Sequence, residues 1–188
     1  MYSKAVVVQN GAKNIKMEEG GADEAQPVQD GGEAAPARGM RFFSGKYSLK
    51  IDEKGRFNIP SKCRDLLGED VYMYVISDTR IQVWSQAAAE AGPWADLAHE
   101  LELHRTDSSK GLSYSEYTTI LGCYIPVTVD AQKRIILPPE LRKTAAGGKG
   151  DQVLTGCGDH LMLRTVEDWE NAQQKASAAM ARFNARYD

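Results

Sequence analysis

Cysteine and histidine are scarce in this 188-residue sequence, with three residues of each type. No pair of cysteines has C-x-x-C spacing, and an odd number of cysteines does not fit a disulfide framework. We therefore predict neither disulfides nor a metal site nor a bound cofactor. We interpret the cysteines as buried apolar residues and the histidines as surface or packing residues; they are Cys63, Cys123, Cys157, His99, His104 and His160.

Long apolar runs are also lacking, and the longest one near the N-terminus is only the stretch 5–8. This is too short for a membrane span or for the core of a signal peptide, so we expect a cytoplasmic protein. The sequence has no nucleophile elbow, no phosphate-binding loop and no metal-ligand spacing. We therefore expect no enzymatic activity.

The sequence contains one motif that occurs twice, over Asp52–Pro60 and Asp130–Pro138. Asp, Arg and Pro recur at the same offsets, and a further Arg follows four residues after each Pro. All these pairs are 78 positions apart. A duplication of this length predicts two half-domain units that share one core or dock as twins.

Both copies of the motif are basic, although the whole chain has a net charge of −3. The stretch 46–64 holds six basic and two acidic residues, and the stretch 130–143 holds four basic and two acidic residues. A single basic turn is ordinarily only a solvated charged loop without a partner. A basic surface that is presented twice favours a polyanionic partner.

We predict four segments along the chain. Residues 1–39 are rich in glycine, alanine and acidic residues without amphipathic period, so we expect a disordered extension. Residues 40–104 form the first barrel repeat with a following helix, residues 105–122 a connecting helical segment, and residues 123–188 the second repeat with a C-terminal helix. The fold class is α+β, mainly β.

The hydrophobic pattern predicts the elements of both repeats. In the first repeat we expect strands over 47–51, 57–59, 71–76 and 81–84, with a helix over 62–67 that Ser61 caps. In the second repeat we expect strands over 125–129, 135–137, 153–155 and 161–163, with a helix over 139–143. Further helices are expected over 86–103, interrupted near Gly92-Pro93, and over 113–121 and 166–183, the last with an apolar stripe that packs on the barrel.

The motif itself predicts a tight turn with a basic tip. Gly55 permits the positive φ that such a turn needs, and Asp52 can accept N–H bonds within it or pair with Arg56. Lys54 and Arg56 would then lie on a fixed, protruding loop. An ion pair that only staples the turn is the ordinary alternative. The duplication and the extra cations favour a surface that contacts phosphates and bases.

These residues resemble the MraZ family of bacterial transcriptional regulators, over residues 40 to about 172. The resemblance is carried by 43–47, 52–60, Leu121-Gly122, 130–134, 136–142 and 167–170. It implies a duplicated swapped-hairpin β-barrel related to AbrB-type domains, with flanking helices, two pseudo-symmetric copies and assembly into a ring. It also implies a sequence-specific DNA-binding regulator of the division and cell-wall gene cluster, which binds repeated boxes upstream of its own operon. In such proteins the arginine of the first motif, here Arg56, is associated with DNA contact.

The sequence departs from the family pattern at three places. Lys133 stands where the family usually has glycine, so we expect a differently shaped second turn. The segment 77–84 lacks the usual Gly-Cys-Leu and Tyr-Pro pattern, and the helix around 113–120 lacks the paired arginines. We therefore expect the first copy to contact DNA and the second to complete the barrel and the assembly.

The leading hypothesis is thus a nucleoid-associated homo-oligomer that binds double-stranded DNA in its own promoter region. An AbrB-like antitoxin, or a protein-interaction module whose basic turns meet an acidic partner, is the alternative. The predicted roles are base contacts in the major groove for Lys54 and Arg56 and phosphate contacts for the other cations of the first copy. The candidate DNA-binding residues are Arg56, Lys54, Lys46, Lys50, Lys62, Arg64, Arg134 and Lys133, and the turn residues are Asp52, Gly55 and Asp130.

Overall fold

A computed structural model of the chain describes residues 42–187, and the expected disordered extension over 1–39 lies outside this range. The strands are β1 (Lys46–Ile51), β2 (Arg56–Asn58), β3 (Val71–Ser77), β4 (Arg80–Ser85), β5 (Ile125–Val129), β6 (Arg134–Ile136), β7 (Gly150–Gly156) and β8 (Leu161–Thr165). The helices are α1 (Ser61–Leu67), α2 (Gln86–Ala91), α3 (Pro93–Thr106), α4 (Tyr114–Gly122) and α5 (Val166–Asn184), with a 3₁₀ turn, η1, over Leu141–Lys143.

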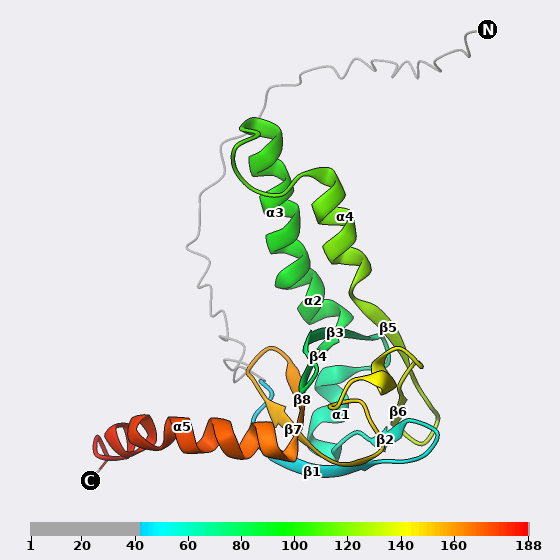
Figure 1. The fold of residues 1–188 in the computed structure, drawn as a ribbon, viewed down its shortest axis with the longest axis vertical. Helices are drawn as coiled ribbons and strands as arrows, with labels where there is room; N and C mark the ends of the chain where they lie inside the picture. The colour runs from blue at the N-terminus through cyan, green and yellow to red at the C-terminus, as the bar shows by residue number, and fades with distance from the viewer. Residues whose placement is uncertain (1–41, 188) are drawn as a thin grey trace, which may run out of the picture. The chain divides into compact units, whose positions relative to one another are not determined.

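The eight strands form one antiparallel sheet in the order β1-β7-β8-β4-β3-β5-β6-β2, which curves into a nearly closed barrel (Figure 1). Strands β1–β4 belong to the first repeat and β5–β8 to the second. Along the sheet, pairs within one repeat alternate with pairs between the two repeats. The repeats are therefore interleaved, and each supplies the neighbouring strands that the other needs for its hydrogen bonds. This is the duplicated β-barrel fold that the family resemblance implies.

One hydrophobic core serves both repeats. Its fully buried members include Ile51 and Phe57 from the first repeat and Ile135 and Leu163 from the second, each at most 2% exposed. Of the two arrangements that the duplication allowed, the repeats adopt the one with a shared core.

The helices α3 and α4 lie side by side (Figure 1), and aromatic contacts join them to the barrel. Trp94 of α3 packs edge-on against Tyr72 of β3, with ring centroids 4.9 Å apart. Tyr124, just after α4, stacks on Tyr74 of β3 at 4.8 Å. A capping box between Ser113 and Glu116 begins α4 and satisfies N–H groups at its first turn.

Several local expectations were wrong. Ser61 is the first residue of α1 and makes no capping bond, because Pro60 occupies the N-cap position. The helix expected over 139–143 is only the single turn η1, and β6 ends one residue before Leu137.

The C-terminal helix α5 contacts the barrel, as its apolar stripe predicts, but the contact is a shallow one. None of the described residues of α5 is buried, and its contacts with the barrel are made with β7 and β8. Its apolar residues Met180 and Phe183 are 49% and 55% exposed. Within residues 42–187, no helix is both long and apolar enough to span a membrane.

Candidate nucleic-acid interface

The first turn, Asp52–Arg56, joins β1 to β2 and is held almost entirely by Asp52. The backbone N–H of Asp52 donates to the carbonyl of Arg56 at 3.0 Å, and Gly55 donates to the carbonyl of Asp52 at 2.9 Å. The carboxylate accepts the backbone N–H groups of Lys54 and Arg56, both at 2.9 Å. Gly55 adopts φ +73°, as the motif predicts.

Arg56 is bound to the same carboxylate through two guanidinium nitrogens, Nε at 2.7 Å and Nη2 at 2.6 Å. These bonds, and the backbone N–H of Arg56, lower the pKa of Asp52 to about 2. The Asp52–Arg56 ion pair that stabilises the turn is thus present. It fixes the direction of the arginine and leaves the other guanidinium N–H donors for a further acceptor.

The second turn, Asp130–Arg134, repeats this geometry between β5 and β6. Arg134 donates from Nε to Asp130 at 2.8 Å and from Nη2 at 2.7 Å, and the pKa of Asp130 is lowered by these bonds. The backbone bonds of Asp130 to Arg134 and of Lys133 to Asp130 measure 2.9 and 2.8 Å.

The expectation that Lys133 changes the shape of the second turn was therefore wrong. Lys133 adopts φ +60°, close to the value for Gly55, and is the only non-glycine residue with positive φ among residues 42–187. A lysine in this left-handed conformation is strained, so the hydrogen bonds of Asp130 impose the turn shape against the preference of the residue.

The surroundings of the two turns differ in charge. Within the described residues, Lys50, Lys54 and Lys62 are exposed and have no carboxylate within 4 Å. We call these three lysines the free cations. Glu53, the acid at the tip of the first turn, is paired with Lys149 at 2.6 Å. The first turn therefore presents uncompensated positive charge.

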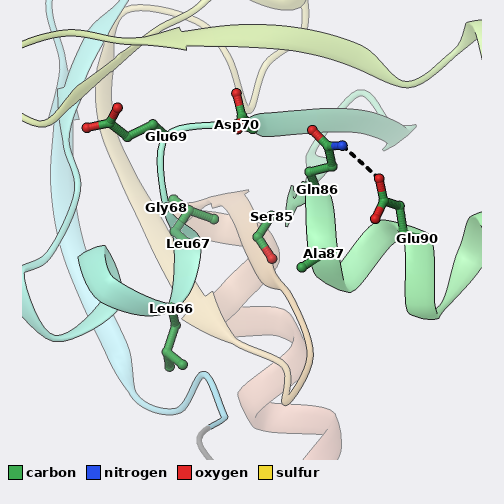
Figure 2. A pocket seen from close by; sticks show the side chains of 9 residues that line it. All are labelled: Leu66, Leu67, Gly68, Glu69, Asp70, Ser85, Gln86, Ala87 and Glu90. Carbon is green, nitrogen blue, oxygen red and sulfur yellow. Dashed lines mark hydrogen bonds between the residues drawn. The ribbon is translucent and has the colours of Figure 1, made fainter.

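At the second turn, Lys133 is paired with Glu69 at 2.6 Å, and this bond lowers the pKa of Glu69. Glu69 lines a shallow pocket of about 370 Å³ together with Asp70 and Glu90 (Figure 2). In this view Gln86 donates a hydrogen bond to Glu90, at 2.7 Å. Glu69 is neutralised by Lys133, and Asp70 and Glu90 add negative charge to the same pocket, so this side of the barrel is a poorer surface for a phosphate than the first turn.

The remaining predicted cations have structural contacts. Arg64 donates from Nε to the carbonyl of Ile59 at 3.0 Å, and Lys46 lies 5.6 Å from the ring centre of Trp169. The structure thus places Arg56 and Lys54 together on one turn. The Arg64 side chain is instead held by its hydrogen bond to the carbonyl of Ile59.

Two interactions were missed in the sequence. Arg142 donates from Nε to the carbonyl of Leu137 at 2.6 Å and covers Gly55, where an added Cβ would lie only 2.3 Å from that nitrogen. The repeat itself carries the signal, because Arg64 makes the same bond 78 positions earlier. The ion pair of Lys133 with Glu69 joins residues far apart in sequence and has no such signal.

The cysteines were only partly predicted. Cys63 is buried, and burial raises the pKa of its thiol, but Cys123 and Cys157 are exposed. A hydrogen bond from His160 lowers the pKa of the Cys157 thiol. The described residues contain no group of three side chains that could hold a metal ion.

Comparisons with known proteins cover most of the chain. The model of a family described as "MraZ protein, putative antitoxin-like" matches residues 42–110 and 125–187. A "Transcriptional regulator MraZ" of Leuconostoc citreum is 31% identical over 133 residues, which is 69% of this chain and 85% of the relative. The protein of the same name from Leifsonia xyli is 30% identical over 141 residues, covering 74% and 92%, and that from Mycobacterium tuberculosis is 31% identical over 137 residues, covering 71% and 87%.

Proposed function

The chain belongs to the MraZ family, and from that premise we propose that it is a transcriptional regulator that binds specific DNA sequences through its first turn. Its targets are repeated boxes upstream of its own operon, in the division and cell-wall gene cluster. We propose no catalytic activity for the protein, and we expect it in the cytoplasm, associated with the nucleoid.

The observation that carries the proposal is the rigid guanidinium of Arg56 beside uncompensated lysines. Asp52 fixes Arg56 through two nitrogens, so little side-chain entropy is lost when the arginine meets a further acceptor. Arginine is the residue best suited to the paired acceptors on a guanine edge. Lys54 lies on the same turn and supplies charge for the phosphates.

The second turn supports a different role in this proposal. Its arginine is held in the same way, but Lys133 is paired with Glu69, and Gln132 stands where the first turn has Lys54. We therefore assign base and phosphate contacts to the first copy, with Arg134 and Lys133 completing the barrel.

Assembly into a ring would supply the affinity that one turn lacks. A single turn with few cations binds weakly, whereas several identical turns on one ring engage several boxes at once. Light scattering of the purified protein tests this part separately, because a monomer at working concentration removes the avidity.

An antitoxin or protein-interaction role is the second candidate, and the description of the matching family as "putative antitoxin-like" favours it. In that case the basic turn meets an acidic protein partner in place of DNA. A toxin-like reading frame beside the gene, and co-purification of its product, would distinguish this function from DNA binding.

The decisive experiment is fluorescence anisotropy with duplex DNA from upstream of the gene and with random DNA of equal length. We expect the upstream DNA to bind more tightly, with affinity falling steeply as salt rises because phosphate contacts release counterions. Arg56→Ala should remove the preference for the upstream DNA. If wild type and Arg56→Ala bind both duplexes equally, the assignment is wrong.

A further inference from the structure

The three cysteines of the chain occupy three different environments. Cys63 is buried, and burial raises the pKa of its thiol. Cys123 is exposed, and its thiol donates to the carbonyl of Thr119 at 3.3 Å, a bond that favours the protonated thiol. Cys157 is exposed as well, but its thiol is hydrogen-bonded to the imidazole of His160. The chemistry of the three thiols can therefore be compared within one molecule.

Cys157 and His160 begin and end the turn between β7 and β8. The backbone N–H of Cys157 donates to the carbonyl of His160 at 2.9 Å, which holds the two residues side by side. Gly158 within the turn adopts φ +92°, and its N–H and carbonyl bond to Phe43 at 3.0 and 2.7 Å. The backbone that carries the thiol and the imidazole is therefore fixed at both ends of the turn and against a neighbouring segment.

The imidazole of His160 is held on three sides, and its side chain is only 13% exposed. The ring stacks on the buried Trp84 with centroids 4.3 Å apart, and Nδ1 lies 2.7 Å from a carboxylate oxygen of Asp159. Nε2 lies 3.3 Å from the amide nitrogen of Gln82, whose amide oxygen accepts from Trp84. Because this amide nitrogen donates, Nε2 is the basic nitrogen of the neutral ring, and Nδ1 carries the proton that Asp159 accepts.

The groups around the thiol favour its ionised form. The bond from His160 is the largest cause that lowers the pKa of Cys157, and the charge of Arg164 adds to it, whereas partial burial opposes it. The sulfur also lies 4.0 Å from the hydroxyl and 3.8 Å from the carbonyl of Thr155. Burial alone would lower the pKa of His160, but its bonds to Cys157 and Asp159 raise it. More thiolate is therefore present at neutral pH than for an ordinary exposed thiol.

We propose that Cys157 is a modification site, an exposed thiol that His160 activates to form a mixed disulfide with a low-molecular-weight disulfide. The thiol proton passes to His160, and the sulfur attacks one sulfur of the small disulfide. The S–S bond of the small molecule breaks, and its other half leaves as a thiolate that takes up the proton. The net products are one mixed disulfide at Cys157 and one small thiol.

This site is separate from the proposed DNA contact. Lys46 at the start of β1 pairs with Thr155 of β7, two residues before Cys157, whereas the first turn follows the other end of β1 at Ile51. The proposal therefore stands or falls independently of DNA binding.

The test exposes the full-length protein, without DNA, to hydroxyethyl disulfide at neutral pH and follows each cysteine by peptide mass spectrometry after an acid quench. We expect Cys157 to be modified at least about fivefold faster than Cys123, because the thiolate is the attacking species. Dithiothreitol should reverse the adduct. Cys63 is buried and should stay unmodified, so its modification reports loss of the fold.

The dependence of these rates on pH tests the role of His160. In the wild type, the rate at Cys157 should reach half of its maximum at a lower pH than the rate at Cys123, since a lowered pKa populates the thiolate earlier. His160→Gln should shift the Cys157 profile to higher pH and slow its modification at neutral pH about threefold or more, with Cys123 unchanged. His99→Gln, which removes an exposed histidine of α3, is the matched control and should change neither rate.

Two results would overturn the proposal. Equal rates at Cys157 and Cys123 would mean that exposure alone governs the modification. A His160→Gln variant with the wild-type rate and pH profile at Cys157 would mean that His160 only packs on Trp84.

If His160→Gln makes Cys63 reactive, the variant has lost its fold, and Asp159→Asn replaces it as the test, because Asp159 is 63% exposed. We expect Asp159→Asn to shift the Cys157 profile to higher pH, since the imidazolium loses its carboxylate partner. An unchanged profile in that variant would contradict activation through His160.

Discussion

The two turns of this protein have the same hydrogen bonds and different surroundings. In both, an aspartate accepts from its own turn and binds an arginine through two nitrogens, at distances that agree within about 0.1 Å. The first turn has glycine at the position of positive φ, next to the exposed Lys54, which has no carboxylate within 4 Å. The second has a strained lysine there, and an acid from the other repeat neutralises it.

The difference teaches that the motif has a structural part and a separable charged part. The Asp–Arg pair occurs in both copies, so it builds the turn irrespective of what the turn does. The copies differ in the residue at positive φ and in the charge on the tip of the turn. The contrast between the turns can therefore be tested by exchanging or removing those features one at a time.

Exchanging the residues at positive φ should have the largest effect. Gly55→Ala adds a Cβ that lies 2.3 Å from Nε of Arg142 and strains the backbone, so we expect a loss of about 1–3 kcal/mol in unfolding free energy. Lys133→Gly relieves the same strain and should stabilise the protein by up to about 1 kcal/mol. Urea unfolding of both variants measures this, with Glu69→Gln as the control for the lost ion pair. Equal effects of one sign would contradict the strain argument.

Removing the lysine at the tip of the first turn should have the next largest effect. Lys54→Ala removes a phosphate contact in the proposed complex, so we expect about five- to tenfold weaker DNA binding and a shallower dependence on salt. Gln132→Ala at the equivalent position of the second turn is the matched control and should leave both quantities unchanged. Titrations at several salt concentrations give the slopes, and equal slopes for Lys54→Ala and wild type would exclude Lys54 from the interface.

Freeing the lysine of the second turn should have a smaller effect in the opposite direction. Glu69→Gln releases Lys133 and removes one acid from the pocket beside it. We expect DNA affinity to rise by about twofold, since an exposed ion pair contributes little energy. The measurement is the same anisotropy titration, and a loss of affinity would mean that Glu69 organises the DNA surface.

Acid should have the smallest effect, through the aspartates that hold the turns. The folded-state pKa of Asp52 is about 2, against an ordinary value of 3.8, so its contribution to stability is present above about pH 4 and is lost as the pH falls toward 2. Asp52→Asn should therefore show less loss of stability over that interval than the wild type. Unfolding curves at pH 2 to 5 measure this. If the unfolding free energy of the variant falls more steeply with decreasing pH than that of the wild type, the assignment is wrong.

Local signals in the sequence predicted most of the elements and the geometry of the first turn. Alternation placed β1, glycine at position 55 predicted the positive φ, and the glycine-proline pair at 92–93 marked the break between α2 and α3. These signals act within a few residues, where backbone sterics and side-chain periodicity decide the outcome.

The features that sequence reasoning missed depend on contacts between distant residues. The pairing of Lys133 with Glu69 and the packing of Arg142 over Gly55 arise only because the repeats interleave. The shape of the second turn was predicted wrongly for a related reason: a propensity argument at Lys133 neglected the hydrogen bonds that Asp130 supplies. The helix expected over 139–143, with Pro139 in its first turn, is a single 3₁₀ turn that begins only at Leu141.

The central claim, that the first turn and not the second contacts DNA, is tested most directly by comparing Arg56→Ala with Arg134→Ala on upstream DNA. Both variants lose the same bonds to an aspartate, so the difference in their affinities reports DNA contact and not turn stability. We predict that Arg56→Ala weakens binding at least about tenfold more than Arg134→Ala, as expected for the loss of a paired base contact. Equal losses, or a larger loss for Arg134→Ala, would contradict the account.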